Sequence, residues 1–470
     1  MRHILAVSGL LLAAGCATNP ATGKSEISLV SESQEIEMGK QGAQETLASM
    51  PLVADSNVQR YVRRVAMELV GVAERPNLPW NFYVLEDAAV NAFAYPGGFI
   101  FITRGILTHM NSEAELAGVL GHEIGHVTAR HTASQITKAQ LAQIGLVAGS
   151  VLSSTVAQMA GAASQGLGLL FMKFGRDAEY QADELGFRYM TKDGYDPRAM
   201  SSMFTMLQRQ SAMGGAGRLP EWQSTHPDPE NRVAKNEQRV GQVQTTPASL
   251  KSNRDQFLQV INGLTFGDDP RQGYFEQNIF YHPDLKLRFT FPQGWKTQNL
   301  PASVLGASPE QDAVVRLSFA KGSPQQALQQ FMGQQGIQAG RASTNPINGL
   351  PAATSEFTVQ TEQGQIAGLA TFVQHSGQTF QVLAYTTGQK YQSIVNTLLG
   401  SVQSIAPLTD QSKLNVQPNR VTLVKLPKDM TIDAFHRTYP SDIPFEYVAI
   451  INGVEAGTLL KAGTLVKQVK

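Results

Sequence analysis

Apolar residues recur at helical spacing through most of the first half of the chain. The spacing predicts helices over 31–49, 57–72 and 112–127, and the first and third of these open on capping-box patterns, Ser-x-x-Gln and Ser-x-x-Glu. Two short runs rich in Phe, Ile and Val, at 82–84 and 99–102, predict strands between these helices. We therefore expect a mainly helical, α+β domain over 31–255.

The period of the apolar pattern changes to two in the second half. Alternation over 268–406, interrupted by helical stretches at 324–333 and 390–404, predicts an α+β domain with a mostly antiparallel sheet. A polar linker at 407–419 follows. The last segment, 420–470, has a strand-like run, two short helical patterns and another strand-like run, which predicts a small βααβ domain.

Composition agrees with a multi-domain globular protein. The 470 residues are too many for one ordinary hydrophobic core. Apolar residues make up 42% and charged residues 16%, which argues against disorder. Lys and Arg (38) balance Asp and Glu (38), and no basic run stands out, so nucleic acid is not an expected partner.

The start of the chain has the pattern of a bacterial targeting segment. A short positive start precedes an apolar run at 4–12, too short to span a bilayer, and small residues lead to Cys16, the single cysteine. This resembles a lipoprotein processing site. It implies a signal peptide at 1–15, a lipidated Cys16, a tether at 16–30 and, because Ala17 follows the cysteine, an outer-membrane location. The alternative is a plain signal peptide with an incidental cysteine.

The motif with the clearest chemistry is the run His122-Glu123-Ile124-Gly125-His126 within the third predicted helix. His122 and His126 lie four apart on one helix face, so two imidazoles can reach a single zinc ion. Glu123 directly follows His122 on the helix, so its carboxylate can approach the ion without binding it and take a proton from water there. The motif therefore predicts zinc-dependent hydrolysis. The alternative is an ordinary pair of histidines on a partly buried helix.

A third zinc ligand must come from a later segment. The pattern HExxHxxGxxH is absent, because the next histidine, His131, follows His126 by five residues. Glu179 and Asp183 lie four apart on another predicted helix, so one carboxylate can bind zinc while the other orients a ligand histidine. Residue chemistry alone leaves open which carboxylate has which role.

These motifs together resemble the peptidase family of the CAAX prenyl proteases, in particular its periplasmic, BepA-like branch. The resemblance covers about 27–240. It implies one Zn²⁺ per chain, the general base Glu123 and a partner for a ligand histidine, Asp183. The zinc ligands that it implies are His122, His126 and Glu179.

Three further features match that branch. His226, in a His-Pro motif, and Arg232 resemble residues that act in the active site, where such a histidine can hold the enzyme latent or polarise the substrate carbonyl. The alternative is a simple helix start. The stretch with Asn91, Gly97 and Gly98 resembles an edge strand beside the cleft, which can take an extended peptide by strand addition. His131 also matches the family, but we interpret it as a histidine favoured at a helix C-terminus.

The remaining segments carry weaker resemblances. The 268–406 domain resembles PsbP-like domains, and 420–470 resembles a divergent LysM domain, either a peptidoglycan-binding or a plain packing module. The Ala-, Gly- and Leu-rich stretch 139–174 is predicted to form two loosely packed helices that cover the cleft or touch the membrane.

The sequence as a whole predicts a lipid-anchored zinc endopeptidase facing the periplasm. Its expected substrates are misfolded or misassembled envelope proteins. Two alternatives remain: an envelope-assembly chaperone whose peptidase is normally latent, and a peptidoglycan amidase.

Overall fold

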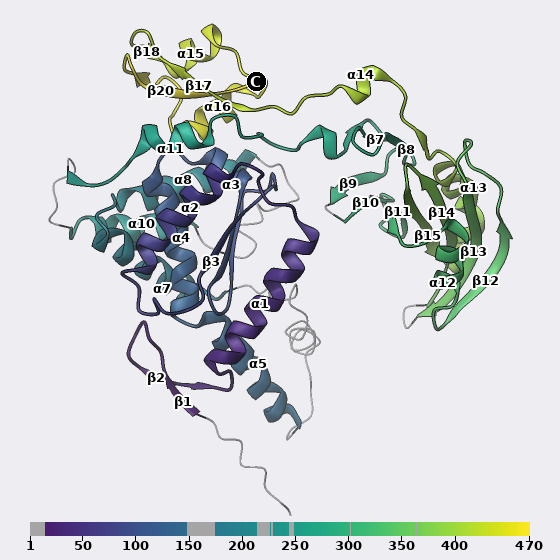
Figure 1. Ribbon diagram of the computed structural model, residues 1–470, viewed down its shortest axis with the longest axis horizontal. Coiled ribbons are helices and arrows are strands. Elements are labelled where there is room, and N and C mark those ends of the chain that lie inside the picture. Colours follow the sequence, from purple (N-terminus) through teal and green to yellow (C-terminus); the bar gives the residue numbers. More distant parts are fainter. Residues whose placement is uncertain are drawn as a thin grey trace, which may run out of the picture. The chain divides into compact units, whose positions relative to one another are not determined.

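The chain forms two compact units in the computed structural model (Figure 1). The first unit combines the chain up to Gly267 with Asn419–Lys470, and the second is Asp268–Pro418. The structure describes residues 15–147, 174–213, 226, 229–243, 249–300, 302–361 and 364–470.

Helices dominate the first unit, as the apolar spacing predicts. The helices expected at 31–49, 57–72 and 112–127 are α1, α2 and α4. The described helices of this part are α1 (Glu32–Ser49), α2 (Ser56–Val70), α3 (Arg104–His109), α4 (Glu113–Thr128), α5 (His131–Val147), α7 (Arg176–Lys192), α8 (Arg198–Met213), α10 (Pro229–Val240) and α11 (Arg254–Ile261).

The two capping boxes predicted from the sequence differ in the structure. Ser31 and Gln34 make both reciprocal hydrogen bonds at the start of α1. At the start of α4, the Ser112 hydroxyl accepts from the Glu115 N–H (3.2 Å), but the Glu115 carboxylate accepts from the N–H of Asn111 (2.6 Å). The second box is therefore only half formed, because the buried carboxylate pairs with the residue before the cap.

A three-stranded sheet lies beside these helices, with the order β3 (Asn81–Leu85), β5 (Phe99–Thr103), β4 (Ala92–Tyr95). β3 pairs with β5 in parallel, and β4 pairs with β5 antiparallel, so β4 is at the sheet edge. Gly97 and Gly98, in the turn between β4 and β5, have φ of +79° and +100°. A Cβ on Gly97 would lie 2.5 Å from the Cα of Ile36 in α1, so this turn requires glycine.

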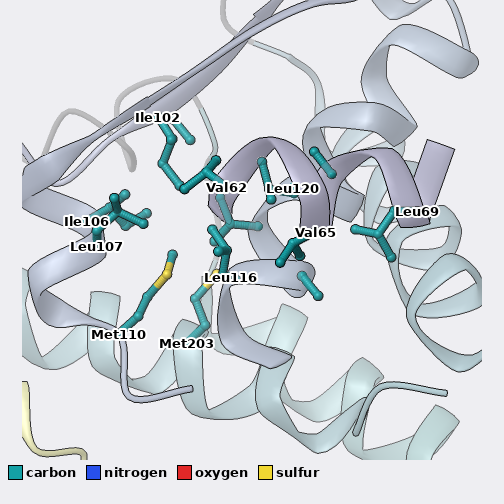
Figure 2. Close-up of a cluster of buried hydrophobic side chains, with 14 of the residues drawn as sticks. Val62, Val65, Leu69, Ile102, Ile106, Leu107, Met110, Leu116, Leu120 and Met203 are labelled. Carbon is teal, nitrogen blue, oxygen red and sulfur yellow. The ribbon is translucent and has the colours of Figure 1, made fainter. Parts of the chain in front are cut away.

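The hydrophobic core fixes α4 between the sheet and the other helices (Figure 2). Leu116 and Leu120 of α4 pack in one cluster with Val65 of α2, Ile102 of β5 and Met203 of α8. All five side chains are at most 1% exposed. Burying each large aliphatic side chain contributes about 1.5–3 kcal/mol, so α4 is held firmly in place.

The segment predicted as a tether, 16–30, contacts the rest of the first unit. It contains an antiparallel hairpin of β1 (Gly15–Thr18) and β2 (Ser25–Ser28). The buried Asn19 amide donates to the Ala129 carbonyl (3.2 Å), just after the end of α4. The signal peptide predicted for 1–15 lies outside the described residues apart from Gly15.

The second unit has the mostly antiparallel sheet that the period of two predicts. All pairings between its described strands are antiparallel. Its seven-stranded sheet has the order β12 (Ile337–Ser343), β13 (Ala352–Thr361), β14 (Gly364–His375), β15 (Gln378–Thr387), β11 (Ala313–Ala320), β10 (Ser303–Ala307), β9 (Lys296–Leu300). A four-stranded sheet has the order β16 (Ala406–Pro407), β8 (Leu287–Thr290), β7 (Ile279–His282), β6 (Tyr274–Glu276). The expected helices are α12 (Pro324–Met332) and α13 (Gly388–Val402); a 3₁₀ turn, Pro270–Gln272, and α14 (Gln411–Leu414) lie near the unit's ends.

The C-terminal segment 420–470 has the expected order of strand, two helices and strand, with a short extra strand pair. Its buried Lys467 ammonium donates to the carbonyls of Thr108 (3.0 Å) and Met110 (2.6 Å) at the end of α3. The segment therefore packs on the helical part of the first unit. Its elements are β17 (Val421–Lys425), β18 (Met430–Thr431), α15 (Ile432–Thr438), α16 (Phe445–Ile451), β19 (Leu459–Leu460) and β20 (Leu465–Val469).

No helix among the described residues is both long and apolar enough to cross a membrane. Most of the stretch 139–174, predicted as two loosely packed helices, lies outside the described residues, which stop at Val147 and resume at Phe174.

Candidate metal centre

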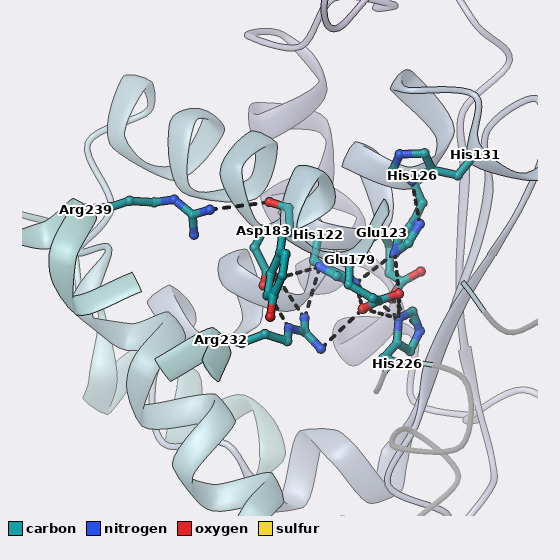
Figure 3. Close-up of polar contacts among 10 residues, drawn as sticks. His122, Glu123, His126, His131, Glu179, Asp183, His226, Arg232 and Arg239 are labelled. Atoms are coloured by element: carbon teal, nitrogen blue, oxygen red, sulfur yellow. Dashed lines mark hydrogen bonds and ion pairs between the residues drawn. The ribbon is translucent and has the colours of Figure 1, made fainter. Parts of the chain in front are cut away.

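The helix α4 carries His122, Glu123 and His126 in the middle of the first unit (Figure 3). All three side chains are buried. Because His122 and His126 are one helical turn apart, their rings face the same side, and their Nε2 atoms lie 2.9 Å from each other. The spacing predicted from the sequence is therefore present as a convergent pair of imidazoles.

Small residues allow α7 to approach α4 very closely. A Cβ on Gly186 of α7 would lie 2.9 Å from the backbone nitrogen of His122. A Cβ on Gly121 would lie 3.1 Å from the Cα of Gly186, and one on Gly125 would lie 3.0 Å from the Ala182 carbonyl oxygen. This close packing brings the carboxylates of α7 into reach of the histidines of α4.

Four side chains converge at one point. His122, His126, Glu179 and His226 each present a donor atom, and these atoms all lie within 4.8 Å of one another. The Glu179 carboxylate is 3.5 Å from each of the two α4 Nε2 atoms. His226 Nδ1 lies 3.2 Å from His122 Nε2 and 3.1 Å from Glu179 Oε1. The structure thus brings together the three residues predicted as ligands and adds His226.

The donor set fits zinc. His122 Nδ1 is 2.9 Å from Asp183 Oδ1, a carboxylate oxygen that accepts, so His122 carries its proton on Nδ1 and a lone pair on Nε2. That lone pair faces His126 Nε2 at 2.9 Å and the Glu179 carboxylate at 3.5 Å. A buried group of nitrogen and carboxylate donors at this separation is the ligand chemistry that Zn²⁺ prefers.

Burial keeps the two α4 histidines neutral. It lowers the pKa of His122 to about 4, and it holds the pKa of His126 well below its usual value, where the neighbouring histidines add to the decrease. For Glu179, burial opposes ionisation, but His226, His122 and Arg232 lower the pKa below its usual value. Neutral imidazoles with an ionised carboxylate are in the protonation states that metal binding requires.

Glu123 lies beside this cluster with an unsatisfied carboxylate oxygen. Burial raises the pKa of Glu123 to about 7. Its Oε1 has no hydrogen-bond partner among the described residues, and the nearest ring nitrogen of His226 is 3.7 Å away. A buried carboxylate oxygen without a partner is costly unless a ligand or water completes it, so it is available to a reacting molecule.

Arg232, from α10, is fully buried behind the metal-binding side chains. Its Nε donates to Asp183 Oδ2 (2.8 Å), its Nη2 donates to Asp183 Oδ1 (2.7 Å), and its Nη1 is 3.3 Å from Glu179. Burial opposes ionisation of Asp183, but Arg232 holds its pKa far below the usual value. Arg232 therefore fixes the carboxylate that orients His122 (Figure 3).

The interpretation of His131 as a helix C-terminal histidine is wrong. His131 is the first residue of α5, after Arg130 in the left-handed region (φ 60°), and its Nδ1 is 2.9 Å from His126 Nδ1. Gln181, which the sequence did not single out, lies 2.8 Å from His131 Nε2. The spacing of five residues could have pointed to His131, but the turn at Arg130 that aims its ring at His126 depends on tertiary contacts.

The other predicted site residues are not among the four that form this cluster. Asn91 precedes the edge strand β4, and its carbonyl accepts from the Thr103 N–H (3.0 Å). Gly97 packs against α1, and a Cβ on Gly98 would lie 3.3 Å from the Trp80 ring. The backbone of Cys16 lies in β1, where it pairs with Ile27.

A buried HExxH helix with a glutamate from a second, closely packed helix defines the class of this domain: it is a metallopeptidase domain of the HExxH type. Comparison with known families specifies it further. Residues 56–240 match the family described as "Peptidase family M48". This part of the chain is thus similar to the M48 metallopeptidases, in agreement with the resemblance seen in the sequence.

Several curated proteins are similar to the chain. The "Beta-barrel assembly-enhancing protease" of Escherichia coli (strain K12) is 32% identical over 250 residues, 51% of this chain and 50% of that protein. The "Putative beta-barrel assembly-enhancing protease" of Vibrio cholerae is 32% identical over 218 residues, 45% of this chain and 44% of that protein. The "Mitochondrial metalloendopeptidase OMA1" of Schizosaccharomyces pombe is 34% identical over 189 residues, 39% of this chain and 53% of that protein. The chain thus spans about half the length of these relatives.

Proposed function

We propose that the protein is a zinc-dependent endopeptidase that hydrolyses misfolded or misassembled proteins of the bacterial envelope. The observation that carries this proposal is the buried convergence of His122, His126 and Glu179 within an M48 domain. The carboxylate of Glu123 next to them adds the proton-transfer group that peptide hydrolysis needs.

In this proposal, His122, His126 and Glu179 hold one zinc ion. Bound zinc supplies a Lewis acid that acidifies water and polarises a peptide carbonyl. Glu123 takes a proton from the attacking water and later delivers a proton to the leaving amine. Asp183, held by Arg232, keeps His122 in the tautomer with a free Nε2.

His226 has two proposed roles that follow from its position among the donor atoms. As a fourth ligand to zinc, it keeps water from the open position and makes the enzyme latent. In a state in which it does not bind zinc, its imidazole can help to stabilise the oxyanion of the reacting carbonyl. Arg232, which the sequence also suggested for the oxyanion, contacts Asp183 and Glu179, and this supports a positioning role.

The proposed substrate site is the edge strand β4. This strand pairs with β5 on one side and is at the edge of the sheet on the other. An extended peptide that adds to this edge is recognised through its main chain, which suits a protease for unfolded proteins of varied sequence. Asn91 and the turn at Gly97 and Gly98 then shape the two ends of the strand.

The envelope location rests on the lipoprotein-like sequence around Cys16 and on the names of the bacterial relatives, which describe enhancement of β-barrel assembly. Lipidation of Cys16 would attach the protein to the outer membrane, facing the periplasm. The PsbP-like domain, 268–406, is then a binding or spacer domain. For the LysM-like segment, 420–470, its contacts with the first unit favour a packing role over peptidoglycan binding.

Casein digestion tests the proposal. A form of the protein that starts at Ala17 is compared with its Glu123→Gln variant, with and without a chelator. We expect cleavage only by the wild type and loss of cleavage on chelation, because the glutamine cannot accept a proton. Equal cleavage by the variant would refute the mechanism.

A second candidate function is an envelope-assembly chaperone with a normally latent peptidase, and the position of His226 favours it. If latency is the resting state, a wild type that binds zinc digests casein slowly, and His226→Ala digests it faster. In cells that lack the protein, Glu123→Gln then still restores envelope assembly. Failure of that variant to restore assembly would count against the chaperone function.

A further inference from the structure

A chain of hydrogen-bonding side chains begins at His126 and leads away from the metal centre. His126 Nδ1 lies 2.9 Å from His131 Nδ1, and His131 Nε2 lies 2.8 Å from Gln181 Oε1. His126 comes from α4, His131 from the start of α5 and Gln181 from α7. Both histidines are buried, so the contact between them is made away from bulk water. Figure 3 shows the two rings next to each other.

With the Gln181 amide oxygen toward His131, as in the structure, and both histidines neutral, the donors and acceptors of this chain have one consistent arrangement. The Gln181 carbonyl oxygen can only accept, so His131 Nε2 carries a proton and donates it. A neutral imidazole has one N–H, so His131 Nδ1 is an acceptor. His126 Nδ1 must then donate to it, and His126 Nε2 keeps its lone pair. That lone pair faces His122 Nε2 and the Glu179 carboxylate.

The junction between α4 and α5 holds His131 in this position. Arg130 adopts the left-handed conformation (φ 60°), which is unfavourable for a residue with a Cβ atom. Its guanidinium pairs with the buried Glu35 and donates to the Val30 carbonyl (2.7 Å). Asn19 donates to the carbonyl of Ala129 (3.2 Å). These contacts from the N-terminal segment stabilise the turn that brings the His131 ring to 4.9 Å from the His126 ring.

We infer that His131 and Gln181 are positioning residues, which hold His126 in the tautomer that leaves Nε2 free to bind zinc. The inference rests on the proposed zinc centre and extends it to the second ligand histidine. His122 is oriented by the Asp183 carboxylate, whereas His126 is oriented by a neutral imidazole and an amide. The two ligands thus receive their orientation from different chemistry.

Zinc affinity of the purified full chain tests the inference without the need for cleavage. His131→Phe removes the acceptor for His126, and Gln181→Met removes the acceptor for His131. Loss of such an outer partner typically weakens metal binding by roughly 10–100-fold. We expect a loss of this size for both variants in competition with a chelating dye, together with a changed visible absorption spectrum of the cobalt-substituted protein.

Two further variants serve as controls. His131→Asn can place an amide oxygen where the imidazole Nδ1 was, so we expect it to recover most of the zinc affinity. His109→Asn removes another buried histidine of the same unit, whose Nδ1 bonds to the Gly105 carbonyl (2.7 Å), and should leave zinc affinity unchanged. Circular dichroism checks the fold of each variant; if His131→Phe is unfolded, Gln181→Met decides.

The possible outcomes separate this inference from the proposed function. Wild-type affinity and an unchanged cobalt spectrum in both His131→Phe and Gln181→Met would overturn the inference. A loss of affinity in His109→Asn equal to theirs would also overturn it, because the effect would then be one of general stability. If the wild type binds zinc but never cleaves a peptide, the proposed function fails while the expected losses of affinity still support the inference.

Discussion

At the scale of single residues, the metal centre depends on buried charges that compensate one another. Arg232 is fully buried, and the carboxylates of Asp183 and Glu179 contact its guanidinium. Asp183 in turn bonds to His122. Each of these charged groups would be costly to bury alone. Removal of any one of them would leave another buried charge without its partner, which destabilises the folded protein.

Removal of the arginine charge should therefore destabilise the metal-free protein strongly. Arg232→Met leaves two buried carboxylates without their cation, and breaking a buried pair in this way costs about 3–5 kcal/mol. Arg198 and Asp196 form a solvent-exposed pair, so Arg198→Met should cost less than about 1 kcal/mol. Urea unfolding in the presence of a chelator measures both. A similar small loss in the two variants would contradict the prediction.

A second residue-scale prediction concerns pH. Burial lowers the pKa of His109 to about 4, and the nearby Lys467 adds to the decrease. The unfolded chain takes up a proton near the ordinary value of 6.5, whereas the folded chain does so only near 4, so stability falls as the pH drops between these values. His109→Asn should reduce this fall by up to about 3 kcal/mol. Urea unfolding of wild type and variant between pH 7 and about pH 4 compares the slopes; parallel slopes would refute the prediction.

At the scale of secondary structure, the crossing of α4 and α7 decides whether the ligands meet. The glycines at the crossing leave no room for a side chain, since a Cβ on Gly186 would meet backbone atoms of Gly121 and His122 at about 3 Å. The helices that carry the histidines and the carboxylates are therefore as close as their backbones permit.

Gly186→Ala should push α7 away from α4. Because the neighbouring atoms are backbone, they cannot move aside cheaply, and we expect a loss of about 1–3 kcal/mol in stability together with weaker zinc binding. Gly400, in helix α13, has open space around its Cβ position, so Gly400→Ala should be neutral or stabilise by up to about 1 kcal/mol. Thermal unfolding and dye competition measure the two effects. Unchanged zinc affinity in Gly186→Ala would contradict the argument.

At the scale of the whole molecule, the second unit is inserted between two neighbouring segments of the first. The Phe266 N–H donates to the Asn419 carbonyl (2.7 Å), so the chain leaves the first unit and returns to it at adjacent points. After the return, the C-terminal segment supplies Ile450 to the main hydrophobic core and buries Lys467 against the end of α3. The C-terminal segment is thus structurally part of the first unit.

Two deletions should consequently behave differently. Replacing Asp268–Pro418 by a short Gly-Ser linker should leave zinc binding intact and change the Tm of the first unit little. Ending the chain at Pro418 removes buried apolar side chains worth several kcal/mol, which should lower the Tm by more than about 10 °C. Calorimetry of the zinc-loaded proteins measures both. A truncated chain as stable as the wild type would show that the C-terminal segment is dispensable.

Local patterns in the sequence were sufficient to predict several helices and strands and the HExxH part of the metal site. Helix α1 with its capping box, the antiparallel strands of the second unit and the HExxH pair on α4 were all predicted. The physical reason is that capping, apolar periodicity and the i, i+4 spacing of ligands involve residues within one or two turns of one another.

Only the tertiary structure decided how distant residues complete the site. Arg232 bonds to Asp183 across 49 positions, and Gln181 reaches His131 across 50. Likewise, the C-terminal Lys467 binds the Thr108 carbonyl across 359 positions. Such pairings depend on how closely helices pack and where the chain turns, as at Arg130. Packing and turns of this kind are set by the whole core, so they leave no periodic signal in the sequence.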